Sequence, residues 1–242
     1  MFEKINQKKA QLDVKRSLPK HTLKSLYEKL LLEWMYHSNA IEGNTLTMNE
    51  IKVVLEGITV GGKTMHEHLE VINHREAITY VEEIVKKREP LSEWQIKNLH
   101  RLILKEINDE YAGAYRDQQV FIAGATHIPP EPMHIKEKME CLIDWYEQEG
   151  KHLHPVKLGA MVHTIFVGIH PFIDGNGRTA RLLLNVELMK AGFPPTVIKV
   201  ENRLGYYDAL DKAQTEKEYD DFVRLVAVEV EDSLDLYLRA IT

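Results

Sequence analysis

The chain has 242 residues, of which 44% are hydrophobic and 28% charged, which is the composition of a globular protein able to bury a sizeable core. Its net charge of -6 disfavours a general attraction to nucleic acid or to anionic lipid. The single cysteine, Cys141, excludes an intramolecular disulfide and a multi-cysteine zinc site.

The sequence carries no targeting or membrane signal that we recognise. Residues 1–20 are polar and rich in lysine, unlike a signal peptide, and no run approaches about 18 apolar residues. We therefore expect a cytoplasmic protein without a membrane or nucleic-acid partner. We interpret residues 1–20 as an N-terminal arm.

Residues 21–60 are predicted to form N-terminal helices. Apolar residues recur at three- and four-residue steps over 21–34, which predicts a helix that pauses near residue 37. A short second piece, Ser38–Glu42, is followed by Gly43, which suits the left-handed position after a helix. The segment 47–50, Thr-Met-Asn-Glu, has the spacing of a capping box and predicts the start of the next helix.

The main part of the chain, residues 61–242, is also predicted to be helical, with one exception. Apolar periodicity and flanking breakers predict helices over 66–87, 92–107, 132–149, 155–169, 178–191, 206–212 and 219–239. Apolar residues surround most of 155–169, so we expect this helix to be central and buried. In the exception, residues 115–130, apolar residues flank a Gly-Ala-Thr turn and two prolines end the segment, which predicts a short β-hairpin.

A glycine-rich loop lies between the central helix and the helix that follows it. Gly175, Asn176 and Gly177 can point successive backbone N–H groups into one concavity. The next helix adds its free N–H groups and the positive end of its dipole. The loop therefore predicts an anion site, for which phosphate is the usual ligand.

Charged side chains around this loop fit phosphate chemistry. Arg178 and Arg181 are three residues apart, so both can reach the same side of the helix. Asp174 lies beside the glycines, where a carboxylate and phosphate oxygens together suit Mg²⁺. His170 ends the central helix and has the residue type of a general base.

The segment 170–181, HPFIDGNGRTAR, resembles the motif of the Fic family, H-x-F-x-[D/E]-G-N-G-R-x-x-R, at every defined position. The resemblance extends over about 38–238 and is strongest for Fic AMP-transferases with an N-terminal inhibitory helix. It implies an all-α Fic fold, a helical bundle with a short β-hairpin flap. It also implies transfer of AMP from ATP to a Ser, Thr or Tyr hydroxyl of a target protein and of the chain itself.

The same resemblance implies roles within the loop. His170 deprotonates the acceptor hydroxyl, and Asp174 holds Mg²⁺ on the α- and β-phosphates. The 175–177 glycine nest cradles the phosphates. Arg178 contacts the phosphate chain, and Arg181 holds the γ-phosphate.

Residues 38–44, SNAIEGN, match the inhibitory pattern [S/T]-x-x-x-E-[G/N] of that family, with Ser38, Glu42 and Gly43 at the defined positions. Ser38 and Glu42 are four residues apart and share one helical face. The resemblance implies that Glu42 pairs with Arg181 and keeps it from the γ-phosphate, so the enzyme is autoinhibited. It further implies that Glu42 could position a water molecule for removal of AMP from a modified target.

Two further regions correspond to nucleotide and target contacts in the family. The predicted hairpin matches the flap, which would bind the target protein by adding its strand to an exposed edge. Four flap residues are expected near the nucleotide: Ala123, Gly124, Ala125 and Thr126. Tyr206 and Tyr207 lie where the family packs aromatic groups against the nucleotide, and Gln214 replaces the usual adenine-binding asparagine.

Two other patterns are rejected as sites. Residues 57–64, GITVGGKT, satisfy the P-loop pattern, but the preceding residues 50–56 read as a helix and no strand–helix alternation surrounds them. The 12 histidines lack a convergent carboxylate or cysteine set that would predict zinc.

The sequence thus predicts an autoinhibited protein adenylyltransferase that uses ATP and Mg²⁺. A lysine stands at the position of Gly177 in the kinase-like Doc branch, so Gly177 favours AMP transfer over phosphate transfer. Two alternatives stay open: transfer of another nucleotide or phosphate, and a nucleotide-binding regulator that acts through partner binding. A homodimer is a further expectation from the family.

Overall fold

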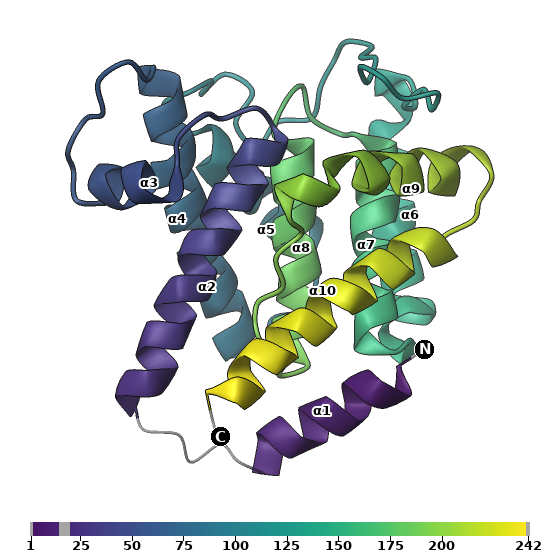
Figure 1. Ribbon diagram of the computed structural model, residues 1–242. Helices are drawn as coiled ribbons and strands as arrows, with labels where there is room; N and C mark the ends of the chain where they lie inside the picture. Colours follow the sequence, from purple (N-terminus) through teal and green to yellow (C-terminus); the bar gives the residue numbers. More distant parts are fainter. Residues whose placement is uncertain (1, 15–19, 241–242) are drawn as a thin grey trace.

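The computed structural model describes residues 2–14 and 20–240, and the regular elements in these ranges are all helices (Figure 1). The α-helices are α1 (Glu3–Val14), α2 (Lys20–Ile41), α3 (Met48–Leu55), α4 (Met65–Lys87), α5 (Glu93–Leu104), α6 (Ile135–Gln148), α7 (Pro155–Ile169), α8 (Asn176–Lys190), α9 (Arg203–Thr215) and α10 (Asp220–Arg239). Short 3₁₀ turns, η1 (Pro132–His134), η2 (Gly150–His152) and η3 (Val200–Asn202), precede α6, α7 and α9.

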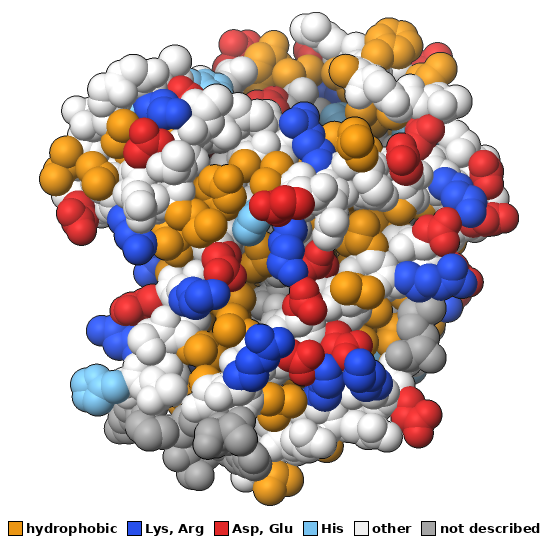
Figure 2. Space-filling model, in the orientation of Figure 1, with side chains coloured by type: hydrophobic (Ala, Val, Ile, Leu, Met, Phe, Trp, Pro, Cys, Tyr) orange, Lys and Arg blue, Asp and Glu red, His pale blue; other side chains and the backbone are white. Residues whose placement is uncertain are grey.

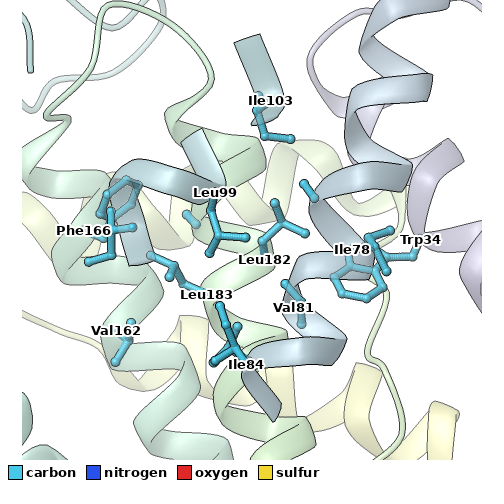
Figure 3. Close-up of a cluster of buried hydrophobic side chains, with 14 of the residues drawn as sticks. Trp34, Ile78, Val81, Ile84, Leu99, Ile103, Val162, Phe166, Leu182 and Leu183 are labelled. Carbon is cyan, nitrogen blue, oxygen red and sulfur yellow. The ribbon is translucent and has the colours of Figure 1, made fainter. Parts of the chain in front are cut away.

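Helices α7 and α8 form the centre of the bundle, as the apolar pattern of 155–169 predicts. They pack so closely that a Cβ on Gly159 would lie 2.9 Å from Leu184 Cδ1. In Figure 3, Val162 and Phe166 of α7 and Leu182 of α8 lie among buried side chains from α2, α4 and α5. This core fixes where α7 ends and α8 begins.

A second core cluster forms on the other side of α7 and α8. It joins apolar side chains of α1, α9 and α10 to the central pair, with Ile5, Tyr206 and Phe222 fully buried. Helix α1 runs along α10 at the bottom of Figure 1. Residues 3–14 of the expected N-terminal arm are therefore a packed helix, while 15–19 lie outside the described residues.

Helix α2 differs from the predicted pattern at its end. The expected pause near residue 37 is absent, because α2 continues to Ile41 against the neighbouring helices. Gly43 follows with φ 102, in the left-handed region expected of it. The capping box at 47–50 is confirmed: the Thr47 side chain accepts from the Glu50 N–H, and Glu50 accepts in return from the Thr47 N–H.

The predicted β-hairpin at 115–130 is wrong, because this segment is an irregular loop without strands. Its polar backbone groups bond to side chains rather than to each other across a ladder. Arg116 donates to the carbonyls of Gln118 and Pro130, and the N–H groups of Thr126 and His127 donate to Asp211. Prolines 129 and 130 have no N–H to give to a ladder.

The outer surface carries interspersed charges. On the face shown in Figure 2, acidic and basic side chains lie next to one another, in keeping with ion pairs such as Lys8–Glu231 and Lys199–Asp232. Among the described helices, none combines the length and the hydrophobicity that a bilayer span requires.

Candidate active site

The C-terminus of α7 places His170 in an uncommon backbone conformation. His170 has φ 49 and ψ 58, in the left-handed region that non-glycine residues rarely adopt. Its N–H donates to the carbonyl of Phe166, and its own carbonyl accepts a bond of 2.9 Å from Arg116 Nε. These contacts fix the direction in which the imidazole leaves the helix.

His170 is uncharged at neutral pH. Partial burial lowers the pKa of its imidazole to about 4, and the nearby Arg116 charge acts in the same direction. A neutral imidazole can accept a proton from a hydroxyl group. The side chain therefore has the protonation state that a general base requires.

Helix α8 begins a few residues later with its first N–H groups at the same end of the bundle. Gly175 is its N-cap, with φ 73. The Asn176 side chain turns back to the loop, donating to the Phe172 carbonyl at 2.8 Å and accepting from the Phe172 N–H at 3.0 Å. Asn176 thus shapes the loop with its side chain, so only its backbone is left to face an anion.

Asp174 is the exposed carboxylate of the loop. Its side chain is 56% exposed, its Oδ1 accepts from the Gly175 N–H at 2.6 Å, and its Oδ2 lies 3.2 Å from Arg178. His100 Nε2 lies 2.8 Å from the Asp174 carbonyl, and its Nδ1 accepts from the Gly113 N–H at 2.9 Å. His100 therefore carries its proton on Nε2 and donates it to Asp174.

The carboxylate side chain of Asp174 suits a cation that is also coordinated by the phosphate oxygens of a ligand. No group of three or more His, Cys, Asp or Glu side chains converges in the described part of the chain. Asp174 offers an exposed carboxylate beside the N-terminus of α8, which suits phosphate. One carboxylate plus phosphate oxygens is a common way for proteins to hold Mg²⁺.

Arg181 is buried among partners from α9 and from the end of α2. Its guanidinium donates to Glu42 Oε1 at 2.7 Å, to the Ser38 hydroxyl at 2.9 Å and to the Ser38 carbonyl at 2.8 Å. Its Nη1 lies 3.2 Å from the Tyr206 hydroxyl. The structure thus brings the end of α2 and the first turns of α8 together.

Glu42 also occupies the space above the first turn of α8. A Cβ built on Gly177 would lie 2.2 Å from Glu42 Oε1, so the carboxylate fills the position that only a glycine leaves open. The Glu42 side chain is 31% exposed, against 3% for Arg181. A carboxylate therefore stands at the end of the helix where an anion is favoured.

The residues of α9 expected near the nucleotide have protein partners. Tyr206 is buried, and its hydroxyl lies between Arg181 and His163. The half-exposed Tyr207 donates to the Ile41 carbonyl at 3.1 Å. Gln214 donates to the Thr164 carbonyl at 2.7 Å, lying so close to α7 that a Cβ on residue 168 would clash with it.

The loop at 115–130 approaches the site from the side of α9. The N–H groups of Thr126 and His127 bond to Asp211 Oδ1 at 2.9 and 2.8 Å, and His127 Nε2 lies 2.8 Å from the Gly168 carbonyl. Ala123 and Gly124 are exposed at the tip of the loop. The loop is thus attached to α9 and to the end of α7 beside His170.

Sequence reasoning missed several residues that build this site. Arg116 holds the His170 carbonyl, Asp211 holds the loop, His100 holds the Asp174 carbonyl, and Glu70 pairs with Arg178 at 2.6 Å. Their partners lie far away in sequence, so no local pattern marks them. The P-loop-like segment 57–64 remains excluded, because helix α3 and not a strand precedes it.

This arrangement combines a proton acceptor with an anion site. The neutral imidazole of His170 lies one short loop from the first turn of α8, and Asp174 lies between them in the chain. Such a site can take a proton from a hydroxyl group and bind the phosphates of the group that this hydroxyl attacks.

Comparison with known proteins gives one consistent family. Residues 90–188 match the Fic/DOC family model. The chain is 38% identical to a protein adenylyltransferase Fic of Nematostella vectensis, covering 100% of this chain and 56% of the relative, and 37% identical to that of Drosophila willistoni, covering 96% and 47%. It therefore spans about half the length of these curated relatives.

Two solved structures have the same fold over nearly the whole chain. Fic-1 (residues 134–508) from C. elegans is 32% identical with a TM-score of 0.88, covering 98% of this chain and 72% of that one. A Fic domain containing signaling protein from Bacteroides thetaiotaomicron is 31% identical with a TM-score of 0.90, covering 99% of this chain and 97% of that one.

Proposed function

This chain belongs to the Fic/DOC family, and we propose that it transfers the AMP group of ATP to a hydroxyl side chain of a target protein and of itself. The observation that carries the proposal is the pairing of the neutral imidazole of His170 with the anion site at the start of α8. Relatives of the chain are named protein adenylyltransferases.

In the proposed reaction the acceptor oxygen attacks the α-phosphorus of ATP. The new O–P bond forms as the bond to the β-phosphate oxygen breaks, and pyrophosphate leaves. His170 takes the proton of the acceptor hydroxyl. The N–H groups around Gly175 and Gly177, together with the dipole of α8, stabilise the phosphate charge.

We propose that Mg²⁺ accompanies the nucleotide at Asp174. The exposed carboxylate would hold it, and phosphate oxygens would complete its coordination. The ion, when bound, supplies positive charge that offsets the charge of the phosphates.

We further propose that Glu42 restrains the resting enzyme. Its carboxylate forms an ion pair with the guanidinium of Arg181 and also fills the space above Gly177. A nucleotide with a γ-phosphate at Arg181 has to displace this carboxylate. Removing Glu42 therefore frees a cation and opens the end of α8 at the same time.

The loop before α6 provides a surface for the target protein. Phe121, Ile128 and Met133 are 76%, 63% and 78% exposed and line a groove of about 560 Å³ together with Gln119. Figure 2 shows hydrophobic side chains at the top right of the molecule, where Figure 1 draws this loop. We propose that an apolar segment of the target lies here, so that its hydroxyl reaches His170.

Self-modification of a Glu42→Gly variant tests the function. With labelled ATP, we expect at least a tenfold increase in AMP attached to the chain, and the increase should vanish in Glu42→Gly/His170→Ala. Glu56→Gly is a matched control, since Glu56 is another exposed glutamate at a helix C-terminus. Mass spectrometry identifies the added group, and competition with GTP and CTP tests the choice of nucleotide.

The two rival functions give different results in the same experiment. A phosphate-transfer enzyme would add a phosphoryl group instead of AMP. A nucleotide-binding regulator would bind ATP more tightly after Glu42→Gly but would leave every protein unmodified. Either result would refute the proposal.

A further inference from the structure

Glu70, in the second turn of α4, is a buried carboxylate facing the catalytic loop. It is 7% exposed. Its Oε1 accepts a bond of 2.6 Å from Arg178 Nη1, although the two residues are 108 positions apart in the chain. A buried charge of this kind is stable only when it is paired and hydrogen-bonded.

The other oxygen of Glu70 fixes the orientation of the carboxylate. Oε2 accepts from Asn44 Nδ2 at 2.8 Å, and Asn44 is itself held by its bond to the Glu67 carbonyl. His66, on the solvent side, lies 3.5 Å from Oε1. The carboxylate is therefore held with Oε1 directed at Arg178.

Arg178 is shared unequally between two carboxylates. Its side chain is 2% exposed and lies 2.6 Å from Glu70 but 3.2 Å from Asp174 Oδ2. Glu70 is thus the closer partner. The exposed Asp174 keeps only the longer contact with this arginine, which leaves its carboxylate available to another cation.

The net charge around Asp174 depends on the presence of the Glu70 carboxylate beside Arg178. Glu70, Arg178 and Asp174 together carry one net negative charge. Buried His74 adds no positive charge, since burial and the nearby Arg181 and Arg178 lower its pKa to about 3. Without the charge of Glu70, the three groups would sum to zero and Arg178 would have Asp174 as its only carboxylate.

We infer that Glu70 is a positioning residue that occupies Arg178 and so leaves the Asp174 carboxylate free for the divalent cation of the nucleotide. This inference rests on the proposed function, because that function brings a metal-bound nucleotide to Asp174. Glu70 itself touches neither the nucleotide nor the reacting atoms. Partners that orient a metal ligand commonly change metal affinity by about 10- to 100-fold when they are replaced.

Calorimetric titration with ADP, once with Mg²⁺ and once with EDTA, tests the inference in the Glu42→Gly background. The quantity of interest is the factor by which Mg²⁺ strengthens ADP binding. We expect Glu70→Gln to lower this factor by about tenfold. ADP binding in EDTA should stay equal or become tighter, because the site has lost a negative charge.

A matched control and a second variant separate charge from structure. Glu76→Gln makes the same change in the same helix, at a residue whose side chain is 40% exposed and paired with Lys105, and should leave the factor unchanged. Adding Arg178→Gln to Glu70→Gln removes both charges and should bring the factor back towards its starting value. Thermal melting of each variant verifies that it is folded.

Three results would overturn the inference. They are an unchanged factor in Glu70→Gln, an equal loss of ADP binding with and without Mg²⁺, and no recovery in the double variant. None of these measurements depends on AMP transfer. Failure of the proposed function would instead appear as an inactive Glu42→Gly variant, whatever the titrations show.

Discussion

Gly177 provides a test of where the Glu42 carboxylate lies, without any measurement of activity. A Cβ at this position would lie 2.2 Å from Glu42 Oε1 and 3.1 Å from Arg181 Nη1. Gly177 lies within α8 and is not among the glycines with positive φ, so its backbone tolerates alanine. The Gly177→Ala side chain therefore conflicts with Glu42 rather than with its own helix.

The size of the effect follows from how the conflict is relieved. Glu42 Oε1 is the end of a flexible side chain, so the carboxylate can swing outward at the cost of its bond to Arg181. A charge-assisted hydrogen bond contributes about 1.5–3 kcal/mol, and the 31% exposure of Glu42 reduces this to roughly 1–2 kcal/mol. In Glu42→Gly the conflict is absent, and alanine in place of glycine should be neutral or stabilising by up to about 1 kcal/mol.

Thermal or urea unfolding of four proteins measures the coupling: the unaltered chain, Gly177→Ala, Glu42→Gly and the double variant. We expect Gly177→Ala to shift Tm by about 2–8 °C less favourably in the unaltered chain than in Glu42→Gly, since 1 kcal/mol corresponds to about 2–4 °C for a protein of this size. The same substitution should not lower Tm once Glu42 is glycine. Additive effects of the two substitutions would show that Glu42 does not lie above Gly177.

The remaining predictions concern pH and the loop at 115–130. Because the pKa of His170 is lowered to about 4, its base form is present above that pH, and AMP transfer by Glu42→Gly should not fall with a midpoint near 6.5 between pH 8 and 5.5. A fall in activity with a midpoint near 6.5 would contradict this. Arg116→Met should lower kcat by about tenfold or more and speed proteolytic cleavage within the loop, because Arg116 holds the His170 carbonyl and both ends of the loop. Arg101→Met, at an exposed arginine, should change neither.

Local patterns predicted the elements whose structure is decided locally. The capping box at 47–50 and the left-handed Gly43 depend on backbone groups a few residues away. The central position of 155–169 followed from its apolar circumference. The glycine-rich segment likewise follows the central helix, but α8 begins at Asn176 rather than near residue 178, so of its three residues only Gly175 lies outside the helix.

The hairpin at 115–130 failed for a physical reason. Apolar residues on either side of a turn resemble paired strands, but strands need a ladder of backbone bonds. In this loop Arg116 donates hydrogen bonds to the carbonyls. Asp211, more than 80 residues away, accepts hydrogen bonds from the N–H groups. Nothing in the local pattern shows that such distant partners exist.

Glu70 was missed for the same reason. In the sequence it is one of several glutamates on a predicted helix, and a solvated surface position is the usual place for such a residue. Its burial depends on α4 packing against α8, which brings Arg178 to it. Only the three-dimensional arrangement distinguishes it from Glu76, which is on the same helix and exposed.

The two arginines of α8 differ in how permanently they are paired. Cations near a helix N-terminus oppose its dipole, so Arg178 and Arg181 each need a carboxylate from another helix. Glu70 supplies one from a buried position, where its side chain is 9% exposed, whereas Glu42 supplies the other with 31% of its side chain exposed. Displacing Glu70 would leave a buried charge without water, while a displaced Glu42 can move into solvent. We therefore expect an incoming phosphate to exchange with Glu42 at Arg181 and to leave the pair of Glu70 and Arg178 intact.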